Sequence, residues 1–275
     1  MMIETKFSVL MSLYIKEKPE YVRACFESLL RQTVPADEWV VVEDGPLTNE
    51  LYLLLEEYNN KYPNLIKRVP LTQNRGLGLA LREGIIQCSN ELIARMDTDD
   101  VARNDRFEKQ LNEFVKNPSL DICGSHISEF YDTPEKIIAR RIVPLVDKEI
   151  KKYERRRDAF NHMSVMYKKS TVLKAGNYQH AMLMEDSLLW INMILAGATC
   201  CNIDDSLVFV RTGKDMYERR GGLGYFRKYR SGKKRILETG YISQLDYLCT
   251  IWLQFIIATM PNSLREWVYK RFLRS

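Results

Sequence analysis

The chain has 275 residues, of which 45% are hydrophobic and 28% are charged, and it contains no internal repeat or low-complexity segment. This length and composition exclude a fibrous protein and suffice for one large α/β domain, or for one domain with an appendage. The formal net charge is +5, and basic residues gather in 148–157 and 219–235, which suits phosphates, nucleic acid or an anionic membrane surface as partners.

Strands and helices alternate in the first part of the chain. Buried strands are predicted at four short apolar runs, residues 7–14, 39–42, 66–71 and 92–94. Amphipathic helices are predicted after the first three runs, at residues 21–32, 51–58 and 74–87. This alternation predicts an α/β fold with a doubly wound, mostly parallel sheet and helices on both of its faces.

Carboxylates stand where two of these strands end. Asp97, Asp99 and Asp100 follow the fourth apolar run, and Asp44 follows the second. The carboxyl ends of parallel strands share one sheet edge, where open α/β sheets bind ligands. Three acids so close repel one another unless a cation lies among them, and Mg²⁺ or Mn²⁺ carrying a diphosphate suits such oxygen ligands. The alternative interpretation is a solvated acidic turn or helix cap. The acid at the end of a second strand, Asp44, favours a site for a nucleotide diphosphate and its metal ion instead.

The second part of the chain has a less regular pattern. Three further strands are predicted at residues 121–130, 137–143 and 160–167, and two helices at 107–115 and 147–157. The last of these strands contains His162, and a lone histidine is more often structural than a ligand. Glu185 and Asp186 begin a helix, where acids are ordinary partners of the helix dipole. They would also serve as a general base if that helix end faces a diphosphate.

The C-terminal region is basic and partly apolar. Gly221 and Gly222 predict a segment able to change conformation. The apolar run 245–260 carries Asp246 and Gln254 and is too short and too polar to span a membrane. As a helix it would place Leu248, Trp252, Phe255 and Ile256 on one face. That face suits either docking on an anionic membrane or packing on the rest of the chain.

The cysteines and the N-terminus bear on location. None of the six cysteines forms a Cys-x-x-Cys pair, so zinc and thioredoxin chemistry are not expected. The cysteines are expected to be small core residues of a reduced, cytosolic protein. Residues 1–6 lack the apolar stretch of a signal peptide, which agrees with that location.

Five motifs, taken in order, resemble those of family 2 glycosyltransferases of the GT-A fold. They are FSVLMS at 7–12, VVEDG at 41–45, NRG at 74–76, RMDTDD at 95–100 and ED at 185–186. The sequence is similar in particular to exopolysaccharide enzymes of the amylovoran type, also in FNH at 160–162 and RRGG at 219–222. The resemblance covers essentially the whole chain. Two departures from the family motif lie near the expected position of the nucleotide base. Glu43 replaces the usual Asp, and Pro46 replaces the usual Ser.

The resemblance implies an activity and a division of the chain. The activity is transfer of a sugar, with inversion, from a nucleotide-diphosphate sugar such as a UDP-hexose to a glycan or polyprenyl-diphosphate-linked acceptor. The enzyme would lie in the cytoplasm, attached peripherally to the anionic inner face of the plasma membrane. A catalytic domain is expected at 1–215, with a nucleotide-binding half at about 1–100 and an acceptor-binding half at about 101–215. A basic helical extension is expected at 216–275.

The resemblance also implies roles for single residues. The nucleotide is expected to contact Leu13, Tyr14, Asp44, Arg75 and Asp97. Mn²⁺ or Mg²⁺ is expected to bind Asp99 directly, with help from Asp97. The expected catalytic base is Asp186, with its neighbour Glu185 as the second choice. The acceptor or the diphosphate is expected near His162 and Arg220.

The sequence argues against three other functions. A nucleotidyltransferase would carry a glycine-rich phosphate loop directly after the first strand, and residues 14–18 contain no glycine. A degenerate relative that only binds nucleotide or membrane would not need Asp97, Asp99 and Asp186 together. A nucleic-acid partner is not expected, because the basic residues do not interleave with aromatic residues on the sheet.

Overall fold

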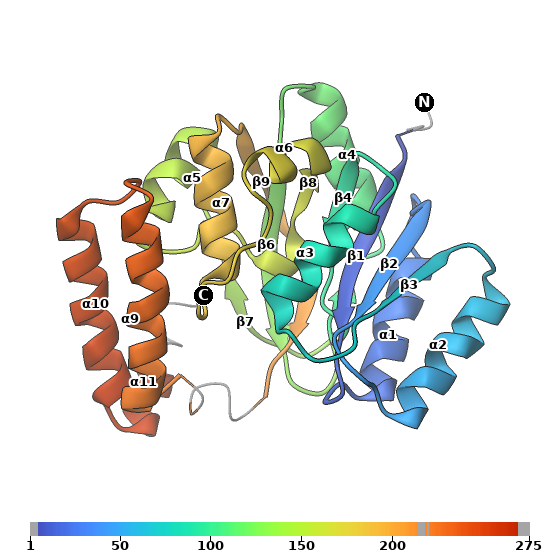
Figure 1. Ribbon diagram of the computed structural model, residues 1–275, viewed down its shortest axis with the longest axis horizontal. Coiled ribbons are helices and arrows are strands. Elements are labelled where there is room, and N and C mark those ends of the chain that lie inside the picture. Colours follow the sequence, from blue (N-terminus) through green and yellow to red (C-terminus); the bar gives the residue numbers. More distant parts are fainter. Residues whose placement is uncertain (1–4, 214–217, 219, 269–275) are drawn as a thin grey trace.

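A mixed β-sheet forms the centre of the molecule (Figure 1). The computed structural model describes residues 5–213, 218 and 220–268. Within these residues the sheet has nine strands in the order β3-β2-β1-β4-β8-β6-β9-β5, with β7 paired to β6. The strands are β1 Phe7–Leu13, β2 Glu38–Glu43, β3 Ile66–Pro70, β4 Leu92–Arg95, β5 Val101–Ala102, β6 Ile122–Phe130, β7 Ile137–Arg141, β8 Met166–Lys168 and β9 Cys200–Arg211.

The first four strands are parallel, as predicted. The strand β1 pairs in parallel with β2 and β4, and β2 pairs in parallel with β3. Because Leu13 lies beside Glu43 in this register, β1 and β2 end together at one sheet edge. Side chains alternate between the two faces of a strand, so Val9 packs in one core cluster and Leu10 in another.

Helices cover both faces of this parallel part and bury both clusters. The cluster around Val9 includes residues of α1 Pro19–Leu30, α2 Asn49–Lys61 and α4 Arg106–Lys116. The cluster around Leu10 includes residues of α3 Leu77–Gln87 and α7 Glu185–Leu195. Two shorter helices, α5 Asp147–Glu154 and α6 Lys169–Lys174, complete the central part. The predicted α/β sheet with helices on both faces is confirmed.

The second half of the sheet is mixed rather than mostly parallel. The strand β8 is antiparallel to both β4 and β6, whereas β6 and β9 are parallel. The predicted strand at 160–167 is wrong over most of its length, because a 3₁₀ turn occupies His162–Ser164. Polar groups explain the turn: the Asn161 amide and the Ser164 hydroxyl both donate to the Ser125 carbonyl, and such local bonds compete with a strand ladder.

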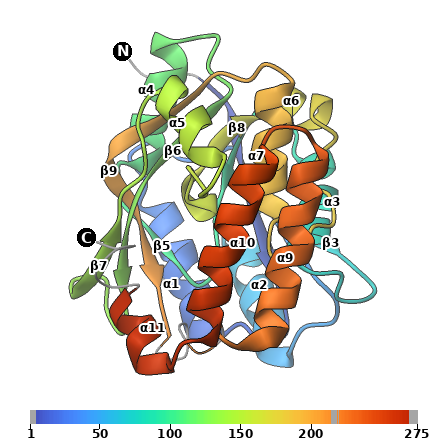
Figure 2. The ribbon, with the colours of Figure 1, turned by 90° about the vertical axis from the view of Figure 1, so that its left-hand side faces the viewer.

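In the C-terminal part, the described residues form the helices α9 Gly222–Glu238, α10 Gln244–Thr259 and α11 Asn262–Val268. Figure 2 shows α9 and α10 side by side, with α11 at their lower end. Ile236 and Ile242 pack against Leu188 and Ile191 of α7. The described helices include none with the length and apolar character needed to cross a membrane. Residues 1–4, Arg219 and the basic residues beyond 268, which entered the sequence predictions, lie outside the described residues.

The cysteines follow the prediction with one exception. All six are free, and Cys25, Cys88, Cys123 and Cys200 are buried. Cys201 is partly buried, whereas Cys249 on α10 is exposed. Most of them are therefore small core residues, as the sequence predicts.

Candidate functional site

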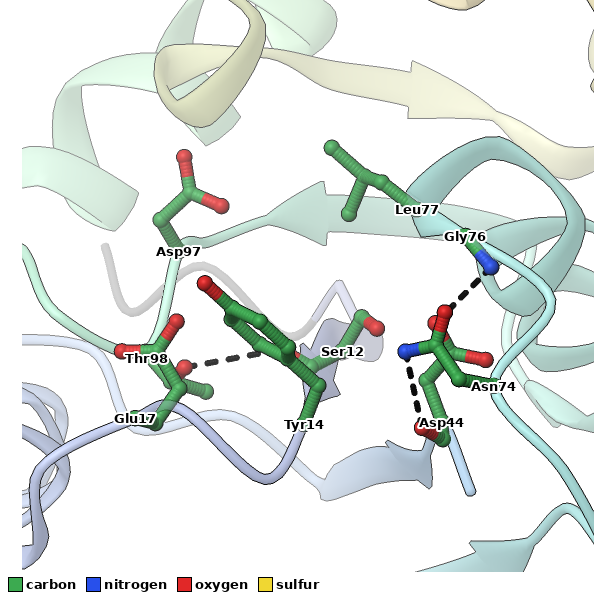
Figure 3. Close-up of a pocket in the computed structure, with 9 residues that line it drawn as sticks. All are labelled: Ser12, Tyr14, Glu17, Asp44, Asn74, Gly76, Leu77, Asp97 and Thr98. Carbon is green, nitrogen blue, oxygen red and sulfur yellow. Dashed lines mark hydrogen bonds between the residues drawn. The ribbon is translucent and has the colours of Figure 1, made fainter.

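A cavity of about 310 Å³ opens at the edge where β1, β2 and β4 end (Figure 3). Its lining comes from four places: the chain after β1, the end of β2, the loop before α3 and the chain after β4. The lining residues are Ser12, Tyr14, Glu17, Asp44, Asn74, Gly76, Leu77, Asp97 and Thr98. A crevice at the carboxyl ends of parallel strands is the usual ligand site of an open α/β sheet. In Figure 3 the Tyr14 hydroxyl points toward Asp97.

Asp44 holds one wall of this cavity in place. Its carboxylate accepts hydrogen bonds from the backbone N–H groups of Arg75, at 2.6 Å, and Gly76, at 3.0 Å. The Asn74 amide donates back to the Asp44 carbonyl at 3.1 Å. Gly45 permits this approach, because it has φ +85° and a Cβ there would lie 2.6 Å from the Asn74 nitrogen. The end of β2 and the start of α3 are thus fastened together as one wall of the cavity.

The other residues expected at the nucleotide are placed differently. The guanidinium of Arg75 pairs with Glu83 at 3.0 Å and lines a separate cavity with Arg82, so only its main chain serves the wall described above. Leu13 is fully buried in the core, although its neighbours Ser12 and Tyr14 line the cavity.

Glu43, the departure from the family motif, has a structural partner. Its carboxylate accepts two hydrogen bonds from the Arg68 guanidinium of β3, at 2.5 and 3.1 Å. Glu43 is buried while Arg68 is partly exposed. The extra carbon of Glu relative to Asp therefore reaches across to β3 instead of lining the cavity.

Three carboxylates gather beside the cavity. Oxygens of Asp97, Asp99 and Asp100 lie within 4.8 Å of one another. The buried guanidinium of Arg95 pairs with Asp97 at 2.5 Å. Burial, and then the charge of Asp97, raise the pKa of Asp99 to about 6. Burial, and then the charge of Asp99, hold the pKa of Asp100 well above its usual range.

This donor set fits a divalent cation. One Asp100 oxygen accepts from the Arg211 backbone N–H at 2.8 Å, and its other oxygen is buried with no hydrogen-bond partner among the described residues. An unpaired buried carboxylate oxygen is costly. A cation among the three acids would remove both that cost and their mutual repulsion. Oxygen ligands of this kind suit Mg²⁺ or Mn²⁺.

Two residues beside the acids were not singled out as site residues from the sequence. Arg211 ends β9, donates from Nε to the Asp99 carbonyl at 3.2 Å and lies over the ring of Tyr21 at 4.0 Å. Glu17 lines the cavity, and burial, followed by the charges of Asp99 and Asp97, raises its pKa to about 7. Neither residue belongs to a recognisable motif, so only the folded chain shows them.

The two candidate bases begin α7. Asp186 accepts from the Ser187 backbone N–H at 2.9 Å, and burial, then the charge of Asp158, raise its pKa to about 7. The Ser187 hydroxyl donates to the Asp158 carboxylate. Glu185 packs on the start of α3, since a Cβ on Gly78 would lie 2.6 Å from the Glu185 Cγ. Glu185 thus supports the wall of the cavity at the strand ends, while Asp186 adjoins Asp158.

His162 and Arg220 have different surroundings. His162 is hydrogen bonded through Nε2 to the Tyr178 hydroxyl at 2.7 Å, and burial, then the charge of Arg95, keep its pKa well below its usual value. This neutral, partnered ring fits the structural interpretation of a lone histidine. Arg220 lines a second cavity of about 260 Å³, together with Asp158.

Comparisons with known sequences identify the family. A sequence model described as Glycosyl transferase family 2 matches residues 8–176. An uncharacterized glycosyltransferase of Haemophilus influenzae is 43% identical, covering 98% of this chain and 99% of its own. The amylovoran biosynthesis glycosyltransferase AmsE of Erwinia amylovora is 38% identical, covering 96% and 98%. An Escherichia coli protein named UDP-Gal:alpha-D-GlcNAc-diphosphoundecaprenol beta-1,3-galactosyltransferase is 34% identical, covering 98% and 97%.

Solved structures agree on the fold. The mannosyltransferase PcManGT of Pyrobaculum calidifontis, in complex with GDP-Man and Mn²⁺, has a TM-score of 0.64 at 14% identity and covers 96% of this chain and 73% of its own. A fragment of S. aureus TarS in complex with UDP-GlcNAc has a TM-score of 0.61 at 18% identity, covering 98% and 72%. The resemblance carried by the sequence motifs is confirmed: the chain belongs to glycosyl transferase family 2 and is a glycosyltransferase of the GT-A fold.

Proposed function

We propose that the chain transfers a hexose from a UDP-sugar to a lipid-diphosphate-linked glycan, with inversion, in the synthesis of a surface polysaccharide. The cluster of Asp97, Asp99 and Asp100 beside the cavity is the observation that supports this most. The names of two relatives, one of amylovoran biosynthesis and one acting on a diphosphoundecaprenol-linked GlcNAc, support the acceptor class.

The donor would lie along the cavity at the strand ends. Its uridine would lie between Tyr14 and the wall built on Asp44, and its diphosphate would reach Asp97 and Asp99. Asp97, Asp99 and Asp100 would hold Mg²⁺ or Mn²⁺, which supplies positive charge to the departing diphosphate when bound. Arg211 donates to the Asp99 carbonyl. This hydrogen bond would hold the backbone of the acidic loop in place and so fix the positions of its carboxylates.

Asp186 would accept the proton of the attacking hydroxyl. Its pKa of about 7 is close to the operating pH, and a general base is most effective when its pKa lies there. The hydroxyl oxygen bonds to the anomeric carbon, the bond to the diphosphate breaks, and the proton passes to Asp186. A single displacement of this kind inverts the configuration. Glu185 packs on α3 and remains the second choice for the base.

A transfer assay tests the proposal. Purified protein with Mn²⁺ is incubated with UDP-, GDP- and dTDP-hexoses and a synthetic GlcNAc-diphosphate-alkyl acceptor, and nucleotide release and product are measured. We expect UDP release with one UDP-hexose and a product of inverted anomeric configuration by NMR. Retention of configuration, or transfer only from a GDP- or dTDP-sugar, would contradict the proposal.

We further propose that α10 docks on an anionic membrane. In this helix polar residues are buried and apolar residues face outward. Asp246 and Gln254 are buried, whereas Leu248, Trp252 and Leu253 are 50%, 64% and 58% exposed. Contiguous exposed apolar side chains of this kind mark an interaction surface. Exposed basic residues stand on the adjacent helix α9, among them Arg227, Lys228, Arg230 and Arg235. Each adds about 1 kcal/mol of attraction when it lies near anionic lipid.

Co-sedimentation with phosphatidylglycerol-containing liposomes tests the docking. The full chain is compared with L248S/W252S/L253S and with L53S, which changes an equally exposed leucine of α2. We expect the wild type and L53S to pellet at low salt and the triple variant to remain in solution. Equal pelleting of all three would exclude α10 as the anchor. A dimer in light scattering that the triple variant abolishes would assign the face to a second copy of the chain instead.

A further inference from the structure

A second cavity, of about 260 Å³, lies beside α7 and shares no lining residue with the nucleotide cavity. Five basic side chains from separate parts of the chain line it: Arg141, Arg156, Arg157, Arg220 and Lys233. Asp158 is the one acidic residue among its described lining residues. So many cations converge on one concave site that their mutual repulsion favours an anionic ligand.

Lys233 is the most informative of these side chains. It is only 4% exposed and forms no ion pair within the part of the chain that the structure describes, although Glu154, Asp158 and Asp246 are near enough for their charges to act on it. Gly232 brings α9 close to the chain before α7, since a Cβ there would lie 2.2 Å from the Met182 carbonyl. A charged side chain is rarely buried without a partner, so the fixed ammonium of Lys233 points to a ligand.

Gln254 of α10 leads to the same conclusion. It lines the cavity, and its buried Nε2 has no hydrogen-bond partner among the described residues. Two of the acids nearby are already engaged, because Arg155 and Arg156 bind Asp246 at 2.7 Å and Ser187 donates to Asp158. The third, Glu154, has one buried oxygen without a partner among the described residues, but it does not line the cavity. What remains unsatisfied in the wall is a pair of donors, and a ligand rich in acceptor oxygens satisfies them.

The cavity is linked to the proposed base. Asp158 lines it, accepts from the Ser187 hydroxyl and raises the pKa of the adjacent Asp186. Arg141 in turn donates to the Asp158 carbonyl at 2.8 Å. A ligand held by the basic wall would therefore lie close to the start of α7, where the acceptor hydroxyl loses its proton.

We propose that this basic cavity binds the diphosphate of the acceptor, and that Lys233 and Gln254 are its buried contacts. The inference rests on the proposed function, since it assigns a place to the diphosphate of the acceptor proposed there. A diphosphate offers the several acceptor oxygens that the site lacks, and Arg pairs well with phosphate. The sugar attached to it would then extend toward Asp186. The exposed apolar face of α10 lies on the same helix as Gln254, which suits an acceptor whose lipid stays in the membrane.

The kinetic test compares K233M with K234M, its exposed neighbour on α9. Each variant is measured with GlcNAc-diphosphate-alkyl and with a GlcNAc alkyl glycoside that has no phosphate. We expect K233M to raise KM for the diphosphate acceptor about 10- to 100-fold, the loss expected for one hydrogen bond to a charged group. Its KM for the donor and its activity on the uncharged acceptor should match K234M, and K233R should restore much of the loss. An equal loss on both acceptors, or no loss, would overturn the proposal.

A binding measurement separates failure of this inference from failure of the proposed function. Inorganic pyrophosphate and phosphate are titrated calorimetrically without divalent metal, so that the acidic cluster of the first cavity repels them. We expect one pyrophosphate site per chain in the wild type and in K234M, weakened about 10- to 100-fold in K233M. Phosphate binding as tight as pyrophosphate binding would overturn the assignment to a diphosphate. If pyrophosphate binds as expected but no UDP-hexose is used, the donor assignment fails and the anion site stands.

Discussion

Replacing Asp186 by asparagine should make the protein more stable at neutral and alkaline pH while removing its activity. Burial, and then the charge of Asp158, raise the pKa of Asp186 from 3.8 to about 7. The folded state thus holds this proton more tightly than the unfolded state does. Protonated Asp186 therefore contributes to the free energy of unfolding. This contribution is fully present below pH 3.8, falls as the pH rises toward 7, and stays lost at higher pH.

The size of the effect follows from the shift. One pKa unit corresponds to about 1.4 kcal/mol, so the full shift would cost roughly 4 kcal/mol at pH 8. The side chain keeps some contact with solvent, and screening reduces this to about 2–4 kcal/mol. Asparagine retains the oxygen that accepts from Ser187 but carries no charge, so D186N should be more stable by that amount at pH 8 and nearly equal to wild type at pH 4.

Urea unfolding at pH 4, 6 and 8 measures the difference, with E185Q as the matched control on the neighbouring residue. Turnover of D186N should fall by on the order of 10²–10⁴, the range for loss of a general base. The activity of the wild type should rise with pH through about 7, as Asp186 loses its proton. A variant that is less stable than wild type at pH 8, or a gain that does not change with pH, would refute this reasoning. A larger loss of turnover in E185Q would make Glu185 the base.

Three further substitutions test other parts of the account. D99N should reduce transfer on the order of 10²-fold or more, because it weakens the site for the metal that neutralises the diphosphate, and full wild-type activity in EDTA would contradict this role. G45A should lower the free energy of unfolding by about 2–4 kcal/mol and raise the KM for the donor, because φ is +85° and the new Cβ meets the Asn74 backbone; a silent G45A would show that the loop before α3 can move away. E43Q should lower the free energy of urea unfolding by about 1–3 kcal/mol, because it weakens the ion pair between Glu43 and Arg68. The KM for the donor should not change, because neither residue lines the cavity. A change in that KM would show that Glu43 acts at the nucleotide site.

The sequence predicts the parallel half of the sheet well because two independent patterns agree there. Apolar runs of strand length alternate with helical periodicity, and Asp44 and Asp97 both follow strands. The register of β1 against β2 and β4 then places both acids at the edge of one cavity, as the sequence predicts.

The second half is less predictable because its strands lack a clean apolar pattern. β9 runs from Cys200 to Arg211 but carries Asp204 and Asp205 in its middle, and register shifts near His126 of β6 accommodate them. Without β9 in the prediction, Arg211 could not be placed beside the acidic cluster. The basic cavity that Lys233 lines is equally invisible in the sequence. Its residues come from distant segments, which are brought together by the packing of α9 on α7 and of α10 on α9.

Residue types alone also misplace side chains. Arg75 stands in a motif of the family, yet its guanidinium pairs with Glu83 and its backbone serves the site instead. Spacing along the chain fixes which loop approaches a ligand. It does not fix whether the side chain or the main chain of that loop faces the cavity.

The central claim is that the carboxylates after β4 hold a divalent cation together with the diphosphate of a nucleotide. The most direct test is electron paramagnetic resonance of Mn²⁺ titrated into the wild type and D99N, with and without UDP. We expect one Mn²⁺ per wild-type chain, bound more tightly when UDP is present, with a reciprocal gain in UDP affinity, and neither effect in D99N. Mn²⁺ binding that is indifferent to UDP, or equal in D99N and the wild type, would contradict the claim.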